Sequence, residues 1–540
     1  MRGKKVSLLL AIIIALSLVV SPAIAETGVK DGGNPIITGT EVWEADGVGA
    51  SWVLYDGSST YMMWYSGKDI DGFTAIGYAT ASLPEGPWTK DGSTPVLLKG
   101  DIGEWDAYGV GGPCVIYDTD DSLYKMWYTG MDASQVLRIG YATAVDPEGP
   151  WTKDAGNPVV DVGDAGSWDE NGVGGPCVIR EDATTYKMWY TGRDDNGTGL
   201  GLLAIGYTTS TDGITGWDDN KESAAVMEKS ATATDWDGYG VGAACVMQSG
   251  VGAEATYSMY YTGYGDTTQG GVFAQIGMAQ SGDGLAWTPV ADINPVLEIG
   301  AIASWEENGV GSPCAVKVDG LTNIWYTGSD NNLLTGIGYA TAFPFESTTL
   351  NIGWNMFALP LNPVGDDYDF NLVIGDDVLT SLYFFWYNPA AGKYDAWPSD
   401  DFPAEISRGY WLRLYADDVE VDVEGVDAET ATYADAPTVN KEFYAINLGS
   451  PWNMIGCPFN YQVERAECLI YHDSTYYTIA ESHAVPGGLV SQYIFAYNSV
   501  EGRYDSYDVT DGVLTPWAGY WIRAYQDAVL LVPPTEYVAP

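Results

Sequence analysis

One position beside a repeated motif carries polar or aromatic residues whose chemistry suits ligand recognition. The motif Gly-Val-Gly occurs five times, and the residue directly before it is Asp46, Tyr108, Asn171, Tyr239 and Asn308 in turn. Carboxylates and carboxamides form paired hydrogen bonds to hydroxyl groups, and tyrosine offers a flat apolar ring with a polar tip. This mixture is suited to holding a sugar. Glu170 and Glu307 flank the same position in two copies only, so they are further candidate carboxylates.

Residue types exclude several other kinds of chemistry from these repeats. The histidines of the chain are His472 and His483, near its end. The repeats therefore contain neither a Ser-His-Asp nor a Cys-His nucleophile system, and no histidine-ligated zinc site. The glycine fingerprints of nucleotide sites are also missing. Catalysis within the repeats would have to use carboxylates, with tyrosine or a hard metal ion as the remaining helpers.

Cysteines recur at one position of the repeats, where the first copy has Trp52. The four members are Cys114, Cys177, Cys245 and Cys314. Zinc sites pair cysteines at close spacing, which this set lacks, so we interpret these residues as small apolar side chains packed between repeats. Cys457 and Cys468 lie near the end of the chain, where a disulfide is one option in an exported protein.

No cofactor or metal site is expected, with calcium as the open alternative. Asp-rich turns such as KDIDG (68–72), DTDDS (118–122) and RDDNG (193–197) offer the oxygen ligands that Ca²⁺ prefers. None of them has the complete twelve-residue EF-hand pattern. We therefore interpret them as solvated hairpin turns.

The five copies share one anatomy, which must position the candidate residues. In the third copy, WDENGVGGPCV (168–178) is followed by YKMWYTGRD (186–194) and AIGYTTS (204–210). Each piece is short, β-branched or aromatic, and bounded by Gly, Asp or Pro, which predicts four antiparallel strands per copy. Four-stranded units repeated around an axis form a β-propeller. The sequence therefore predicts five blades, with each Gly-Val-Gly at the start of an innermost strand.

The fifth copy lacks the outer segment that ends the other copies. It stops at IGYATAF (337–343), whereas the segment DGGNPIITG (31–39) precedes the first copy and matches the missing piece. We expect this N-terminal strand to complete the last blade and close the ring, because closure hides sheet edges that otherwise invite aggregation.

Residues 347–540 contain a duplication of their own. FFWYNPAAGKYDAW (384–397) matches IFAYNSVEGRYDSY (494–507), and GYWLRLY (409–415) matches GYWIRAY (519–525). We predict an all-β protein, a five-bladed propeller followed by two small β-sandwich-like modules. The expected segments are a signal peptide over 1–25, the propeller over 26–346, and modules over 347–440 and 441–540.

Charge and targeting signals set the expected location. The chain has 73 acidic and 23 basic residues and a formal net charge of −50, which excludes nucleic-acid binding and disfavours anionic membranes. Residues 1–25 combine a positive start, an apolar run and a small-residue cleavage site, which is typical of a secretory signal peptide. No later apolar run reaches the ~20 residues that a membrane span needs. We expect a secreted protein, extracellular or at the cell surface, without membrane insertion.

The string GGPCVIYDTDDSLYKMWYTG (111–130), followed by IGYATA and GPWTKD, resembles the five-bladed propellers of glycoside hydrolase families 43 and 32, the β-fructosidase and arabinanase superfamily. The resemblance covers about residues 31–345. It implies cleavage of glycosidic bonds by a carboxylate pair. On this basis Asp46 is the candidate base, and Glu170 or Glu307 the candidate acid.

The residues before the aligned strand-start prolines depart from that family. They are Gly112, Gly175 and Ser312, so the expected carboxylates are missing at those positions. The C-terminal repeats resemble modules of secreted bacterial surface proteins, which implies binding or surface attachment.

Three functions follow from these observations. We favour a non-catalytic, glycan-binding propeller whose mouth holds a polysaccharide, with the C-terminal modules contacting a cell-surface partner. The alternative is a glycoside hydrolase that uses the carboxylate pair. A structural surface-coat protein is the second alternative, because high acidity and many tyrosines also fit that role.

Overall fold

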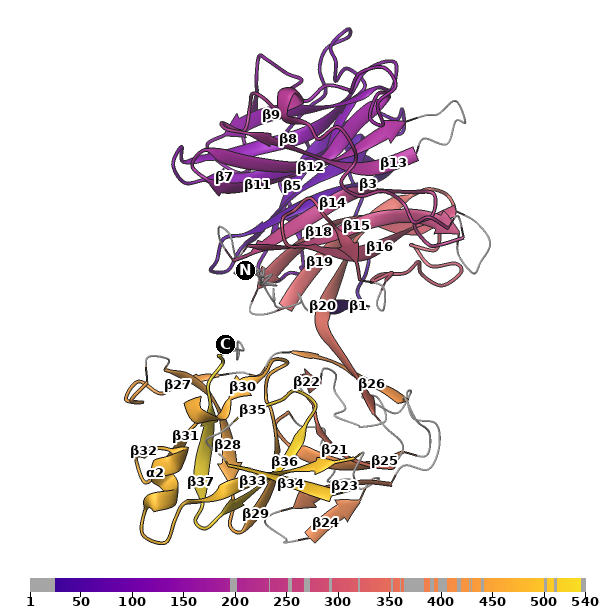
Figure 1. The fold of residues 1–540 in the computed structure, drawn as a ribbon. Helices are drawn as coiled ribbons and strands as arrows, with labels where there is room; N and C mark the ends of the chain where they lie inside the picture. The colour runs from indigo at the N-terminus through magenta and orange to yellow at the C-terminus, as the bar shows by residue number, and fades with distance from the viewer. Residues whose placement is uncertain are drawn as a thin grey trace, which may run out of the picture.

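The computed structural model describes residues 25–535 apart from gaps, of which the longest are 195–201, 267–271, 364–382 and 397–405. Residues 1–24, which hold nearly all of the predicted signal peptide, lie outside the described part. The regular structure is almost entirely β-strand (Figure 1). Among the described residues, no helix is long and apolar enough to cross a membrane.

Five blades surround one axis, and each contains three long antiparallel strands that follow one another along the chain. The strands, blade by blade, are β3 (Gly47–Tyr55), β4 (Tyr61–Lys68) and β5 (Thr74–Ala81); β7 (Gly109–Asp118), β8 (Leu123–Met131) and β9 (Leu137–Ala144); β11 (Gly172–Asp182), β12 (Thr185–Asp194) and β13 (Leu202–Ser210); β14 (Gly240–Ser249), β15 (Thr256–Asp266) and β16 (Val272–Ser281); β18 (Gly309–Val318), β19 (Leu321–Ser329) and β20 (Thr335–Leu350). Every Gly-Val-Gly begins an innermost strand, so the predicted five-bladed propeller is confirmed.

The N-terminal segment closes the ring. In the first four blades an isoleucine of the third strand bridges to a short outer segment, as Ile76 does to Leu97. In the fifth blade the equivalent Ile337 pairs instead with Ile37 of β2 (Ile37–Thr38). Thr335 of β20 also pairs with Gly47 of β3, joining the last blade to the first. The expected closure by the N-terminal strand is therefore confirmed.

A ring of hydrogen bonds joins each blade to the next near the axis. Every innermost strand has a β-bulge after its Gly-Val-Gly, and the bulge residue has a left-handed φ near +50° in each blade. Its N–H donates to a hydroxyl on the second strand of the preceding blade, which satisfies an amide that has left the ladder. The bonds are Ala50 to Thr327 (2.7 Å), Gly112 to Ser66 (2.9 Å), Gly175 to Thr129 (2.8 Å), Ala243 to Thr191 (2.7 Å) and Ser312 to Thr262 (2.8 Å).

Buried tryptophans make a second set of contacts between blades. A tryptophan of the second strand donates its indole N–H to a turn carbonyl of the following blade. The pairs are Trp64 with Pro147, Trp127 with Gly213, Trp189 with Gly284 and Trp325 with Pro84. The fourth blade has Tyr260 at this position. The following blade, the fifth, offers no equivalent turn carbonyl, because its third strand, β20, continues straight past the point where the other third strands end.

Each blade also buries the acidic residue that follows Trp in its first turn. A second-strand tyrosine contacts this carboxylate in every blade, as Tyr326 does at 2.8 Å from Glu306. Four of the five carboxylates also bind a lysine. These pairs are Glu44 with Lys90, Asp106 with Lys153, Asp169 with Lys221 and Glu306 with Lys30. In the fourth blade Pro289 occupies the strand position that the lysine has in other blades. Asp237 Oδ1 is buried there without a hydrogen-bond partner among the described residues.

The C-terminal modules form a pair with pseudo-two-fold symmetry. Their first sheets contain β21 (Gly353–Ala358), β25 (Gly409–Leu414), β23 (Tyr383–Asn388) and β24 (Lys393–Ala396), and equivalently β29 (Trp452–Gly456), β36 (Gly519–Ala524), β33 (Val490–Asn498) and β34 (Arg503–Asp508). Two equivalent bridges, Phe357 to Ala518 and Arg408 to Ile455, connect the sheets. A further sheet packs on the second module through β28 (Glu442–Leu448), β37 (Ala528–Val532), β31 (Leu469–His472) and β32 (Thr475–Thr478).

The propeller and the modules share one strand. β20 runs through the expected boundary between residues 346 and 347 and pairs with β26 (Val419–Val426) of the first module (Figure 1). Cys457 and Cys468 lie in the core of the second module as free, buried thiols. The optional disulfide between them is absent from these described residues.

Replacing Lys153 by Met should lower the free energy of unfolding by about 3 kcal/mol, because Asp106 is 2% exposed and would lose the partner 2.5 Å away. Calorimetry of the propeller transition measures this. Lys68→Met is the matched control, since its pair with Asp46 is about half exposed and is worth less than about 1 kcal/mol. Equal losses in the two variants would contradict the account.

Asp118 gives a pH-dependent prediction. Its burial opposes ionisation, but hydrogen bonds from Lys125 (2.6 Å) and Tyr186 (2.9 Å) outweigh this and lower the pKa of Asp118 to about 2. The lowered pKa stabilises the fold by about 2 kcal/mol above pH 5, and this is lost as the pH falls toward 2. Asp118→Asn should therefore reduce Tm markedly less at pH 2.5 than at pH 7, whereas the exposed Asp120→Asn should have a small effect at both.

Candidate functional site

A cavity of about 330 Å³ opens at the axis of the propeller, where the innermost strands of the second, third and fourth blades begin. Glycine backbone from β7, β11 and β14 forms much of its wall. Glycine lets a ligand approach the backbone closely, because no Cβ intervenes. The longer side chains on the wall are Met131, Arg193 and Tyr264 from the second strands and Leu137 and Leu203 from the third strands. Thr74, Thr129 and Thr191 add hydroxyl groups to a wall that is otherwise mainly apolar.

The five residues before Gly-Val-Gly have one backbone role. Each N–H donates to the carbonyl of the last or nearly last residue of its blade's second strand. The pairs are Asp46 with Lys68 (2.9 Å), Tyr108 with Met131 (2.8 Å), Asn171 with Arg193 (3.0 Å), Tyr239 with Tyr264 (2.8 Å) and Asn308 with Ser329 (2.9 Å). These predicted residues therefore register the start of each innermost strand, and none of them is among the described residues that line the cavity.

The predicted carboxylates are engaged near their own turns. Asp46 is about 43% exposed and forms an ion pair with Lys68 at 2.6 Å. Glu170 accepts the N–H of Gly166, and Glu307 accepts the N–H of Ala303, each at 2.5 Å. Among the described residues on the cavity wall there is neither Asp nor Glu. The catalytic roles of the three carboxylates stay a prediction.

Sequence reasoning missed the residues that do line the mouth. Met131, Arg193 and Tyr264 occupy the fourth position of the strings YTGM, YTGR and YTGY, and the first and fifth blades have Lys68 and Ser329 there. This position carries a different residue in each of the five copies. It follows a glycine that all copies share and, in four copies, it precedes a shared aspartate. Variation between copies singled out the residue before Gly-Val-Gly, and the same criterion would also have found this position. The two positions lie opposite each other on the first and second strands.

Trp52 lies on the axis, further along the innermost strands. Its indole packs against the cores of all five blades and donates to the carbonyl of Val115 at 2.8 Å. The four cysteines at the equivalent position are buried and free, and each sulfur accepts an N–H from the next blade, as Cys114 does from Val178 at 3.2 Å. Burial raises the pKa of Cys114 well above its usual value. These thiols pack between blades, as the sequence indicated.

The Asp-rich turns bind their own backbone. Asp69 accepts the N–H groups of Asp71 (3.0 Å) and Phe73 (2.9 Å), and Asp118 accepts the N–H of Asp120 (3.0 Å) besides its bonds to Lys125 and Tyr186. Part of the turn at 193–197 lies outside the described residues. Within the described part of the chain, no group of three or more His, Cys, Asp or Glu side chains has a geometry that holds a metal ion.

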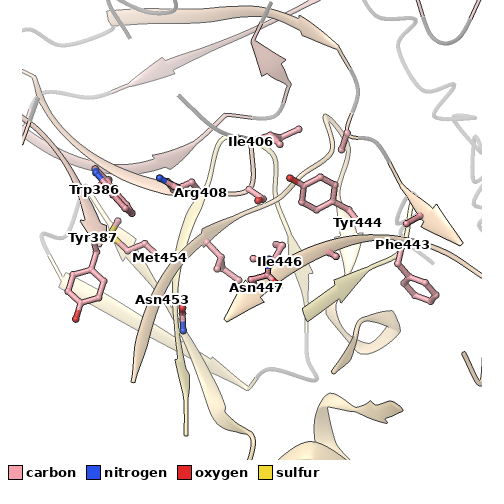
Figure 2. Close-up of a pocket in the computed structure, with 15 residues that line it drawn as sticks. Trp386, Tyr387, Ile406, Arg408, Phe443, Tyr444, Ile446, Asn447, Asn453 and Met454 are labelled. Carbon is pink, nitrogen blue, oxygen red and sulfur yellow. The ribbon is translucent and has the colours of Figure 1, made fainter. Parts of the chain in front are cut away.

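A second cavity, of about 560 Å³, lies between the C-terminal modules. Figure 2 shows Arg408 directed at Trp386, with the guanidinium 4.2 Å from the centre of the indole ring. Tyr444, Asn447 and Met454 border the same space. The second module has Ala496 and Ala518 where the first has Trp386 and Arg408, so this cavity has no symmetric counterpart built from the same side chains.

Replacing Trp52 by Ala should destabilise the propeller by about 3–5 kcal/mol, because all five blades lose contacts to one side chain. The matched control is Trp88→Ala, at a site packed against the core of one blade pair. Urea unfolding of both variants checks the comparison. A loss for Trp52→Ala no larger than the loss for Trp88→Ala would contradict the axial role.

No protein-family model and no curated protein matches the chain. Among solved structures it is similar to a glycosyl hydrolase from Bacteroides ovatus (18% identity, 59% of this chain and 94% of that chain, TM-score 0.43). It is also similar to the catalytic domain of a Coprinopsis cinerea GH62 α-L-arabinofuranosidase (16%, 59% and 97%, TM-score 0.41) and to a thermostable family-43 glycoside hydrolase (16%, 58% and 92%, TM-score 0.41). The propeller assignment itself rests on the strand pairing described above.

Proposed function

We propose that this protein is exported and binds a glycan at the mouth of its propeller without cleaving it. The observation that carries the proposal is the convergence of polar groups from three blades on one cavity. Thr129 comes from the second blade, Thr191 and Arg193 from the third, and Tyr264 from the fourth. A cavity of about 330 Å³ is at the lower end of the range for ligand pockets and suits one or two sugar rings.

A few polar groups on a mainly apolar wall favour a ligand that combines hydroxyl groups with apolar faces, as a sugar does. The threonine oxygens each accept one bulge N–H, and their own hydroxyl hydrogens can be donated to a ligand. Burial raises the pKa of Tyr264, so its hydroxyl stays protonated and able to donate. Arg193 supplies a rigid fork of N–H donors. The absence of carboxylates from the described wall residues favours binding over bond cleavage, which needs two carboxyl groups on opposite sides of the bond.

The test is a glycan array followed by titration of the best ligand. The double variant Arg193→Met, Tyr264→Ala should bind at least about tenfold more weakly, since two hydrogen-bonding groups are lost. Lys68→Met and Ser329→Ala are matched controls, because these residues occupy the equivalent positions in the first and fifth blades and do not themselves line the cavity. Equal weakening in the controls, or no effect of the double variant, would contradict a binding site at this mouth.

The same mixtures decide between binding and hydrolysis. The proposal predicts no released sugar. Release that disappears in Asp46→Asn, and in Glu170→Gln or Glu307→Gln, would make the protein a glycoside hydrolase and replace the proposal. Failure to bind any glycan would contradict the proposal and favour a structural role at the cell surface. Measurements of self-assembly would then test that role.

A further inference from the structure

Two aromatic hollows open between the first sheets of the C-terminal modules. The first hollow has a volume of about 380 Å³, and the second about 450 Å³. The first is lined by Trp354, Phe385, Tyr394, Trp411 and Tyr497. The second is lined by Trp452, Phe495, Tyr504, Trp521 and Tyr387. Residue by residue, the two sets are equivalent under the duplication, so the chain carries one hollow twice.

The two modules build each hollow together. Four rings come from one module and the fifth is a tyrosine from the other. The ring centre of Tyr497 is 4.8 Å from that of Trp411, and the ring centre of Tyr387 is 5.0 Å from that of Trp521. The tryptophan pairs stand nearly perpendicular, at 89° for Trp354 with Trp411. The equivalent pair in the second hollow stands at 87°. The rings of the two hollows therefore have the same arrangement.

Packing between the modules explains only part of this aromatic set. It accounts for Trp411, Tyr394 and Tyr497 and their equivalents, whose rings meet across the module contact. Trp354 and Phe385 instead contact each other on their own sheet, with ring centres 6.1 Å apart, and border the open part of the hollow. Elsewhere the duplicated sheets have diverged, as Trp386 and its equivalent Ala496 show. Rings kept in both copies at an open surface indicate a ligand site.

A cation stands beside each hollow. The guanidinium of Arg413 is 5.6 Å from the ring centre of Trp354, and that of Arg523 is 5.7 Å from Trp452. Both arginines are exposed. The chain has only 23 basic against 73 acidic residues, so a basic residue kept at both hollows gives each one a charge opposite to that of the protein as a whole.

These two features together define the ligand. The faces of aromatic rings are negative and attract the weakly positive C–H groups on the face of a sugar ring. A guanidinium pairs with a carboxylate through two parallel hydrogen bonds. We propose that each hollow binds a saccharide unit that carries a carboxylate, so that the C-terminal pair is a two-site module for a uronic-acid polysaccharide. A quaternary ammonium group also suits aromatic rings, but the neighbouring arginine would repel it.

The sites are counted by calorimetric titration of the full mature chain with digalacturonate. Measurement at 0.15 M NaCl reduces the repulsion by the acidic chain to a range of about 8 Å. The expected stoichiometry is two per chain, falling to one in Trp354→Ala and to none in Trp354→Ala, Trp452→Ala. Tyr507→Ala, which removes an exposed ring outside both hollows, should keep two sites.

The arginines are tested with the exposed double variant Arg413→Met, Arg523→Met, which should fold even if a tryptophan variant does not. We expect about tenfold weaker binding of digalacturonate, down to the affinity of neutral galactobiose for the unaltered chain. Arg193→Met, Tyr264→Ala in the propeller should leave both sites intact, so this inference can fail or hold separately from the proposed function. Absence of digalacturonate binding, a stoichiometry unchanged by Trp354→Ala, or preferential binding of choline would overturn it.

Discussion

The hydrogen bond from each bulge amide to a hydroxyl of the preceding blade is the contact on which the rest of the propeller depends. It requires a residue with left-handed φ next to the axis in every blade, and it leaves an amide that only a neighbouring blade can satisfy. The chain meets the conformational demand with glycine at Gly112 and Gly175 and with small residues in the other blades. Because the bond from Ala50 reaches Thr327, this ring closes only when the first and last blades meet.

Closure has consequences at both ends of the repeat array. The N-terminal segment must supply the outer strand of the fifth blade, since β20 leaves that blade to pair with the first C-terminal module. The turn that would otherwise accept an indole N–H is therefore missing, and Tyr260 replaces tryptophan in the blade before it. One change in connectivity thus explains one exception in the repeat. A second exception has a different origin: Asp237 Oδ1 has no hydrogen-bond partner among the described residues, because Pro289 has the place of a lysine.

Much of this architecture is predictable from the sequence, because internal repeats expose it. Five copies of one string give the blade number, and the missing outer segment of the fifth copy gives the closure. The mouth was harder to predict. The side chains before Gly-Val-Gly vary, but their backbone N–H groups register the strands. The cavity wall takes its side chains from the partner strand, at Met131, Arg193 and Tyr264. The spacing of residues along one strand cannot tell which of two paired positions faces the axis. The contact between the C-terminal modules was also beyond the sequence, since rings such as Tyr387 and Trp521 meet only across the duplication.

The propeller uses different positions of each repeat for holding the ring together and for lining the mouth, although these positions alternate along the sequence. Residues shared by all blades hold the ring together, and the few that differ at the mouth give it an asymmetric wall with a small number of polar groups. The most direct test is a crystal structure of the protein with the glycan it binds best. We predict a sugar in the mouth, with hydroxyl groups within hydrogen-bond distance of Arg193 and Tyr264 and with its bonds intact. A sugar bound elsewhere on the propeller, or cleaved products beside Asp46, would contradict the account.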